Sequence, residues 1–251
     1  MVAVTRPVTV RGVTLGDGST RVIVPLTAAT PDALLTEAAT VAAAGPDLVE
    51  WRIDPLLAAG HGLTVADALR DTLGGLPLLV TLRTAAEGGQ LDVTDPDYLD
   101  LLRTALSTGV VDLLDVELAR TTSAAAAVHA AHDAQVPVVM SEHHFDGTPT
   151  ESDLVAALDR MLAADADVAK IAVMPHSPAD VLTLLSATSS AHARMARPII
   201  SMAMGQLGAV SRIGGGVFGS AATFATVGAA SAPGQLPLAE VRAALGLVEG
   251  R

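Results

Sequence analysis

Short apolar runs alternate with longer alanine- and leucine-rich segments along the chain. The runs are rich in Val and Ile and nearly continuous, a pattern typical of strands buried on both faces of a parallel sheet. They occupy residues 21–26, 47–53, 76–83, 110–118, 136–143, 167–173 and 197–204, with a weaker eighth run at 222–228. The segments between them have helical periodicity and occupy residues 31–43, 64–73, 95–107, 122–134, 151–164, 178–193 and 237–248.

This alternation predicts an α/β fold. Seven clear repeats and a weaker eighth favour a (β/α)8 barrel (TIM barrel) over a doubly wound sheet. The chain has 251 residues, a length at which such barrels form one domain, so we predict a single barrel domain over residues 1–251. The opening "VTVRGVTLGDG" (residues 8–18) predicts a small β-hairpin that closes the bottom of the barrel.

Composition narrows the choice of partners. The net charge is −12 and no basic cluster is present, which argues against nucleic acid and anionic membranes. The absence of Cys excludes disulfides, thiolate nucleophiles and Cys-based metal sites. The N-terminal residues lack the apolar core of a signal peptide and no run is long enough to span a membrane, so we expect a soluble, cytoplasmic protein.

Polar side chains follow several of the predicted strands. In parallel barrels the chemistry lies at the carboxyl ends of the strands, so these side chains are the candidates for a site. They are Glu50, Arg52, Arg83, Asp115, Glu117, His143, Lys170 and Ser201, with Met202 and Met204 nearby.

Lys170 is the only lysine; every other basic side chain among the 15 Lys and Arg residues is Arg. The ordinary interpretation is a buried stem whose charged end reaches solvent. An amine that must lose its proton and attack a carbon cannot be replaced by Arg, because the guanidinium stays protonated. A lone lysine inside a predicted strand therefore favours a nucleophile that forms a Schiff base with a ketone or aldehyde.

His143 lies on the strand that precedes the one carrying Lys170, so we expect the two to be neighbours. Histidine titrates in the range useful for a general acid or base. Adjacent residues of a strand point to opposite faces, which argues against a metal site built from His143 and His144. Surface exposure of one or both histidines is the alternative.

Two pairs of charged residues repeat with a spacing of two, and so face one side of their strands. Glu50 and Arg52 are expected to point into the barrel mouth. Asp115 and Glu117 could either belong to the site or form buried ion pairs within the barrel. Arg212 precedes a glycine run at residues 214–216 that could cradle a phosphate, although the run lacks the Walker lysine and the glycine spacing of a dinucleotide-binding motif.

Seven segments together resemble the type I 3-dehydroquinate dehydratases (3-dehydroquinases). They are "VEWRID", "TLRTAAEGG", "DLLDVEL", "SEHHFDGTP", "AKIAVMP", "ISMAMGQLGAVSRIGGGVFGSAATF" and "SAPGQLPL", in order over residues 47–238. The resemblance implies a lyase of the shikimate pathway, in chorismate and aromatic amino acid biosynthesis, that dehydrates 3-dehydroquinate to 3-dehydroshikimate by syn elimination. It also implies a homodimer that needs no metal or cofactor.

The resemblance also assigns roles to individual residues. Lys170 would form the Schiff base, His143 would act as general acid and base, and Glu87 would position His143. The residues that would bind the substrate are Glu50, Arg52, Arg83, Arg212, Ser231 and Gln235, with Met202, Met204 and Phe224 as pocket walls.

Three residues depart from the family pattern. His144 stands where Asp is usual, Glu142 where an aromatic residue is common, and Gly216 where an acid is found. Two other interpretations are a class I aldolase-type barrel and an inactive relative that senses shikimate-pathway metabolites. Arg212 with the "SAPGQ" segment argues against the aldolase. Lys170, His143 and Glu87 together argue against the sensor, which would not need an amine.

Overall fold

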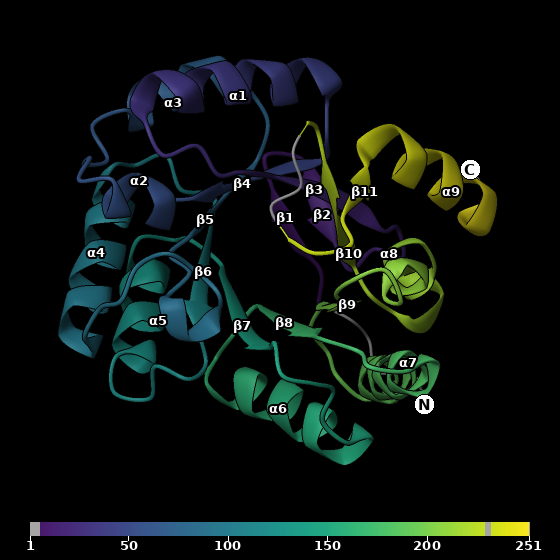
Figure 1. Cartoon of the computed structure of the whole chain (residues 1–251). Helices are drawn as coiled ribbons and strands as arrows, with labels where there is room; N and C mark the ends of the chain where they lie inside the picture. Colours follow the sequence, from purple (N-terminus) through teal and green to yellow (C-terminus); the bar gives the residue numbers. More distant parts are fainter. Residues whose placement is uncertain (1–5, 229–231, 251) are drawn as a thin grey trace.

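The computed structural model describes residues 6–228 and 232–250 and is a (β/α)8 barrel, as predicted (Figure 1). Its central sheet has the order β11-β10-β3-β4-β5-β6-β7-β8-β9, and all pairs are parallel. The ring closes where the Ala221 amide donates to the Ile199 carbonyl over 2.7 Å. The strands are β3 (Arg21–Leu26), β4 (Leu48–Arg52), β5 (Leu78–Thr81), β6 (Leu113–Glu117), β7 (Val138–His144), β8 (Val168–Val173), β9 (Ile199–Ala203), β10 (Ala222–Thr226) and the short β11 (Leu236–Pro237).

Seven longer helices surround the strands (Figure 1). Four begin where a Thr or Ser side chain accepts a hydrogen bond from a backbone amide of the first turn: Thr30, Thr94, Thr150 and Ser177. Such caps satisfy amides that have no partner within the helix. The helices are α1 (Pro31–Ala44), α3 (Ala66–Leu73), α4 (Asp95–Ser107), α5 (Ala124–Asp133), α6 (Glu151–Ala163), α7 (Pro178–His192) and α9 (Leu238–Glu249).

The sequence pattern did not predict four short helical elements. These are α2 (Asp54–Ala58), α8 (Ala209–Gly214) and the 3₁₀ turns η1 (Ala85–Glu87) and η2 (Gly215–Phe218). Each is too short for helical periodicity to be recognised. Within the described ranges, no helix has the length and apolar character needed to cross a membrane.

The bottom of the barrel interior is apolar. Each strand from β3 to β10 contributes one inward side chain to this layer: Ile23, Leu48, Leu79, Leu113, Val139, Val168, Ile200 and Ala222. The hairpin of β1 (Val8–Val10) and β2 (Val13–Leu15) is antiparallel. Its buried Val8, Val10 and Leu15 belong to the same cluster, so the hairpin closes the bottom of the barrel as predicted. The outward residues of the strands form a second, larger core with the helices.

Candidate active site

Above the apolar layer, the barrel interior becomes polar. Because strand side chains alternate in direction, the residues two positions after the apolar layer also face inward. On five consecutive strands these are Glu50, Thr81, Asp115, Ser141 and Lys170. All five are buried. The alternation of side chains along each strand thus places a cluster of polar and charged groups above the apolar layer of the barrel.

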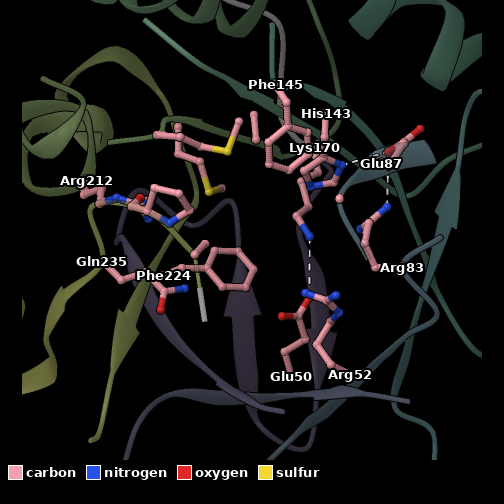
Figure 2. A pocket seen from close by; sticks show the side chains of 16 residues that line it. Glu50, Arg52, Arg83, Glu87, His143, Phe145, Lys170, Arg212, Phe224 and Gln235 are labelled. Atoms are coloured by element: carbon pink, nitrogen blue, oxygen red, sulfur yellow. Dashed lines mark hydrogen bonds and ion pairs between the residues drawn. The ribbon is translucent and has the colours of Figure 1, made fainter. Parts of the chain in front are cut away.

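A pocket opens above this layer (Figure 2). The side chains that the sequence nominated converge there from separate strands and loops. The nominated residues that line it are Glu50, Arg52, Arg83, Glu87, His143, Lys170, Met202, Met204, Arg212, Phe224 and Gln235. Ser231 lies outside the described residues. The placement brings these groups together, whereas their roles remain predictions.

Lys170 is buried within the barrel and does not reach out to solvent, since its side chain is 4% exposed. Its Nζ donates a hydrogen bond to Oδ2 of Asp115 over 3.1 Å and lies 3.6 Å from Oε1 of Glu50. The amine also lies 4.9 Å from the centre of the Phe224 ring. The only lysine of the chain is therefore fixed in a polar cage with an aromatic wall, facing the pocket.

His143 forms a hydrogen-bonded pair with Glu87, whose Oε2 lies 2.8 Å from Nδ1 of the imidazole. Burial, reinforced by the cations Arg83, Lys170 and Arg52, holds the pKa of His143 well below its ordinary value. Burial raises the pKa of Glu87 to about 8, although Arg83 opposes the rise. The imidazole is therefore neutral near pH 7, as a general base must be.

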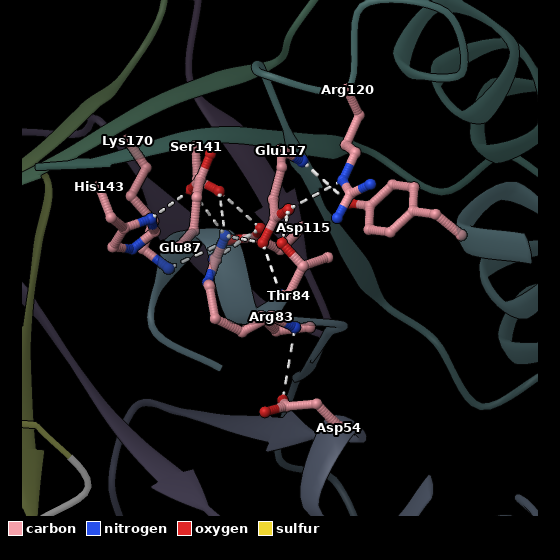
Figure 3. Close-up of polar contacts among 12 residues, drawn as sticks. Asp54, Arg83, Thr84, Glu87, Asp115, Glu117, Arg120, Ser141, His143 and Lys170 are labelled. Atoms are coloured by element: carbon pink, nitrogen blue, oxygen red, sulfur yellow. Dashed lines mark hydrogen bonds and ion pairs between the residues drawn. The ribbon is translucent and has the colours of Figure 1, made fainter. Parts of the chain in front are cut away.

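Arg83 is the centre of a buried polar network (Figure 3). Its Nη1 lies 2.9 Å from Glu117, 3.0 Å from Ser141 and 3.2 Å from Glu87, and its Nη2 lies 2.8 Å from Asp115. Burial alone would lower the pKa of Arg83, but these carboxylates raise it. Asp115 and Glu117 thus form the buried ion pairs that were one of their two interpretations. Asp115 also contacts Lys170, so it belongs to the site as well.

Arg212 differs from the other buried arginine. Its side chain comes from α8, is 1% exposed, and donates from Nη2 to the Pro233 carbonyl over 3.1 Å. Its Nε and Nη1 have no hydrogen-bond partner in the part of the chain that the structure describes. Burial lowers its pKa to about 10, so it remains charged at pH 7. A buried guanidinium with free donors is a ready site for a carboxylate.

Arg52 has a partner that sequence reasoning missed. Nε and Nη2 of Arg52 donate to the two oxygens of Asp54, over 2.7 and 2.8 Å. Asp54 is fully buried and also accepts from the amides of Arg83 and Gln90. It therefore ties the end of β4 to the loop after β5. The spacing of two between Arg52 and Asp54 was a signal for this pair.

Phe145 is a second omission, and it forms a wall of the pocket. Its ring stacks on His143, with the ring centres 6.4 Å apart and the planes inclined by 20°. Phe145 comes two residues after His143, beyond the end of β7, so strand alternation alone could not place it. The remaining unpredicted lining residues are Gly88, Ala172, Ala232 and Pro233.

The residues that depart from the family pattern lie away from the pocket lining. Nε2 of His144 contacts Oε1 of Glu142 over 2.6 Å. A Cβ at Gly216 would lie 2.1 Å from Oγ1 of Thr20, just before β3 and hence at the opposite end of the barrel from the pocket. The glycine run therefore does not form a phosphate cradle at this site. Among the described residues, no group of three or more His, Asp or Glu side chains could hold a metal.

Comparison with known proteins places this chain in a family. The sequence profile of the type I 3-dehydroquinase family matches residues 22–251. A 3-dehydroquinate dehydratase of Lactiplantibacillus plantarum is 46% identical over 92% of this chain and 94% of its own length. One of Klebsiella pneumoniae is 45% identical over 95% of this chain and 97% of its own.

Solved structures agree with the sequence relatives. The 3-dehydroquinate dehydratase of Geobacillus kaustophilus superposes with a TM-score of 0.95 at 37% identity, covering 100% of this chain and 99% of that one. The type I enzyme of Clostridium difficile, solved with covalently modified comenic acid, gives a TM-score of 0.92 at 37% identity, covering 98% of both chains.

Proposed function

The chain belongs to the type I 3-dehydroquinase family, and on that premise we propose how it dehydrates 3-dehydroquinate to 3-dehydroshikimate in the shikimate pathway. Lys170 forms a Schiff base with the ring ketone of the substrate. His143 then removes a proton from the neighbouring carbon and returns it to the departing hydroxyl. The observation that carries this proposal is the buried Lys170 amine, which faces the same pocket as the neutral His143.

The Schiff base is needed because the C–H bond beside a ketone is a weak acid. A protonated imine withdraws electrons from that carbon, so the proton can leave to give an enamine. The enamine then expels the hydroxyl as water and regenerates the conjugated imine, which hydrolyses to the product. The relative from Clostridium difficile was solved with covalently modified comenic acid. This supports covalent chemistry in a site of this family.

One histidine can serve both proton transfers when they occur on one face of the ring. With Nδ1 of His143 bonded to Glu87, Nε2 is the nitrogen available to the substrate. It accepts the proton from carbon and later donates it to the leaving hydroxyl, which matches a syn elimination. Glu87 fixes the orientation of the imidazole.

The remaining pocket residues bind and orient the substrate. Arg212, whose buried Nε and Nη1 have no partner among the described residues, pairs with the substrate carboxylate. Glu50, Arg52 and Arg83 bind hydroxyls and the reacting end, and the residues that complete the enclosure are Ser231, Gln235, Met202, Met204 and Phe224.

The test is the intact mass of the protein after incubation with 3-dehydroquinate and borohydride, followed by peptide mapping. Borohydride reduces an imine to a stable amine, so an adduct confined to the peptide containing Lys170 is expected. The N-terminal amine is the internal control, because it is the chain's only other amine. Full turnover without any adduct at Lys170 would contradict the Schiff-base mechanism.

The family also suggests a setting for the enzyme. We propose a homodimer in the cytoplasm, from the resemblance alone. Sedimentation equilibrium of the purified protein tests the dimer, and a mass equal to one chain at micromolar concentration would contradict it.

A further inference from the structure

Asp115 is the carboxylate nearest to the proposed nucleophile. Its Oδ2 accepts from Nζ of Lys170 over 3.1 Å, whereas Glu50 lies 3.6 Å from the same nitrogen. Asp115 lies on β6, is fully buried, and does not line the pocket. It therefore contacts the reacting nitrogen from below, on the side away from the substrate.

The two oxygens of Asp115 have different partners (Figure 3). Oδ1 accepts from Nη2 of Arg83 over 2.8 Å and from Oγ of Ser141 over 2.7 Å. Both donors are buried and come from neighbouring positions of the barrel. Oδ2 is bonded to Lys170. A carboxylate fixed at one oxygen presents the other in one direction, and here that direction is the amine.

Imine formation changes what Lys170 can donate. When the protonated form of Lys170 is taken as the starting point, the ammonium and the ketone give an iminium and one water molecule. The positive charge is conserved. Two of the three protons on nitrogen leave with the carbonyl oxygen, and the third remains on the nitrogen. The iminium is thus a buried cation with a single N–H, and it needs one acceptor of opposite charge.

We propose that Asp115 is the counter-ion of this iminium, accepting its single N–H at Oδ2. The assignment rests on the proposed Schiff base at Lys170. It gives Asp115 two effects on the reaction. The carboxylate keeps the imine protonated, the form that withdraws electrons, and its fixed direction sets the orientation of the carbon–nitrogen double bond toward His143.

The other nearby acids fit this role less well. Glu50 is farther from the nitrogen, accepts a hydrogen bond from Oγ1 of Thr81, and lines the pocket where substrate binds. Glu117 accepts from the amide and hydroxyl of Thr84 and from Arg83. The charged or titratable groups that contact Lys170 or line the same pocket are Asp115 and Glu50, His143 on the adjacent strand with its partner Glu87, and the cations Arg83, Arg52 and Arg212.

The chain offers a matched pair of variants for the test. Asp115→Asn and Glu117→Gln each remove one negative charge from the same buried network on β6, but only the first removes the contact with Lys170. Turnover is measured against pH for both, with borohydride trapping at Lys170 as a second readout. Turnover should fall at high pH as the iminium loses its proton, and we call this fall the alkaline limb. In Asp115→Asn we expect the alkaline limb to move to lower pH by about one to three units, because one close opposite charge usually has an effect of this size on a pKa.

Glu117→Gln is expected to keep the alkaline limb of the unaltered protein, even if its turnover or stability falls. An unmoved limb in Asp115→Asn, or an equal shift in both variants, would overturn the assignment. If the unaltered protein gives no adduct at Lys170, the Schiff-base proposal itself fails and this assignment with it. An adduct in the unaltered protein with no shift in Asp115→Asn refutes the counter-ion alone.

A measurement on the unaltered protein covers the case in which Asp115→Asn does not fold. Because Lys170 is the only lysine, labelling lysine with ¹⁵N at Nζ gives one side-chain signal in the spectrum. With 3-dehydroquinate bound, we expect an iminium nitrogen that still carries its proton at pH 8. An imine nitrogen without a proton at that pH would overturn the assignment.

Discussion

Nδ1 of His143 and Oε2 of Glu87 lie 2.8 Å apart, although 56 residues separate them in the chain. His143 lies next to the last residue of β7, and Glu87 belongs to a 3₁₀ turn after β5, the strand two positions away in the sheet. Arg83 contacts the same oxygen of Glu87 over 3.2 Å. The pair therefore joins the proposed general base to the buried network beneath the pocket, and its protonation should affect both stability and turnover.

Replacing Glu87 by Gln should change how stability depends on pH. Burial raises the pKa of Glu87 from 4.5 to about 8, so between these values the folded protein holds a proton that the unfolded chain has released. The contribution to stability is then complete below 4.5 and is lost as the pH rises through about 8.

Gln is neutral throughout, so Glu87→Gln lacks this dependence. From about pH 5 to about pH 8, the melting temperature of the unaltered protein should fall by at least about 2 °C relative to the variant. Differential scanning calorimetry at several pH values measures this difference. If the melting temperatures of the two proteins changed in parallel with pH across this range, Glu87 would be ionised in the folded protein.

Two substitutions at Lys170 separate its charge from its chemistry. Lys170→Ala removes one of the two cations that contact Asp115 and the ammonium beside Glu50, and breaking such a buried pair costs about 3–5 kcal/mol of unfolding free energy. Lys170→Arg keeps a cation there but cannot form an imine. Both should lose at least about a thousand-fold in turnover, while the loss of stability should be smaller in Lys170→Arg. Urea unfolding and a dehydration assay measure the two effects, and an active Lys170→Arg would disprove covalent catalysis.

His143 and His144 are adjacent, yet only His143 lines the pocket with the nominated site residues. His143→Ala should still form the borohydride-trapped adduct at Lys170 but lose at least about a hundred-fold in turnover, because the proton transfers lack their carrier. His144→Ala is the matched control, since its partner is Glu142, and it should keep turnover within about threefold. Full activity in His143→Ala would mean that another base operates.

Arg212 should be more important for binding than for stability. Its buried Nε and Nη1 have no partner among the described residues, so the folded protein gains little from this charge before substrate binds. Arg212→Met should leave the unfolding free energy unchanged within about 1 kcal/mol or increase it. It should also raise KM by at least about a hundred-fold, which steady-state kinetics would measure. A large loss of stability would mean that the guanidinium supports the fold.

The sequence alone determined the repeating part of this protein. Alternation along the strand predicted that Glu50 and Arg52 point into the barrel mouth, where both line the pocket, and the helical periods located the seven longer helices. These features depend on residues one to four positions apart, and their spacing can be read directly from the sequence. The sequence also showed that Lys170 is the only lysine, because this follows from the composition alone.

Only the tertiary structure decided which polar groups meet. Asp115 divides its oxygens between Arg83, Ser141 and Lys170, contacts that span 26 to 55 residues. Nε and Nη1 of Arg212 have no partner among the described residues, and its Nη2 donates to the Pro233 carbonyl. Such contacts depend on strand register and on the stagger that closing a barrel imposes, which local periodicity does not encode. The physical reason is that alternation fixes the face on which a side chain lies, while register fixes its height and therefore its partners.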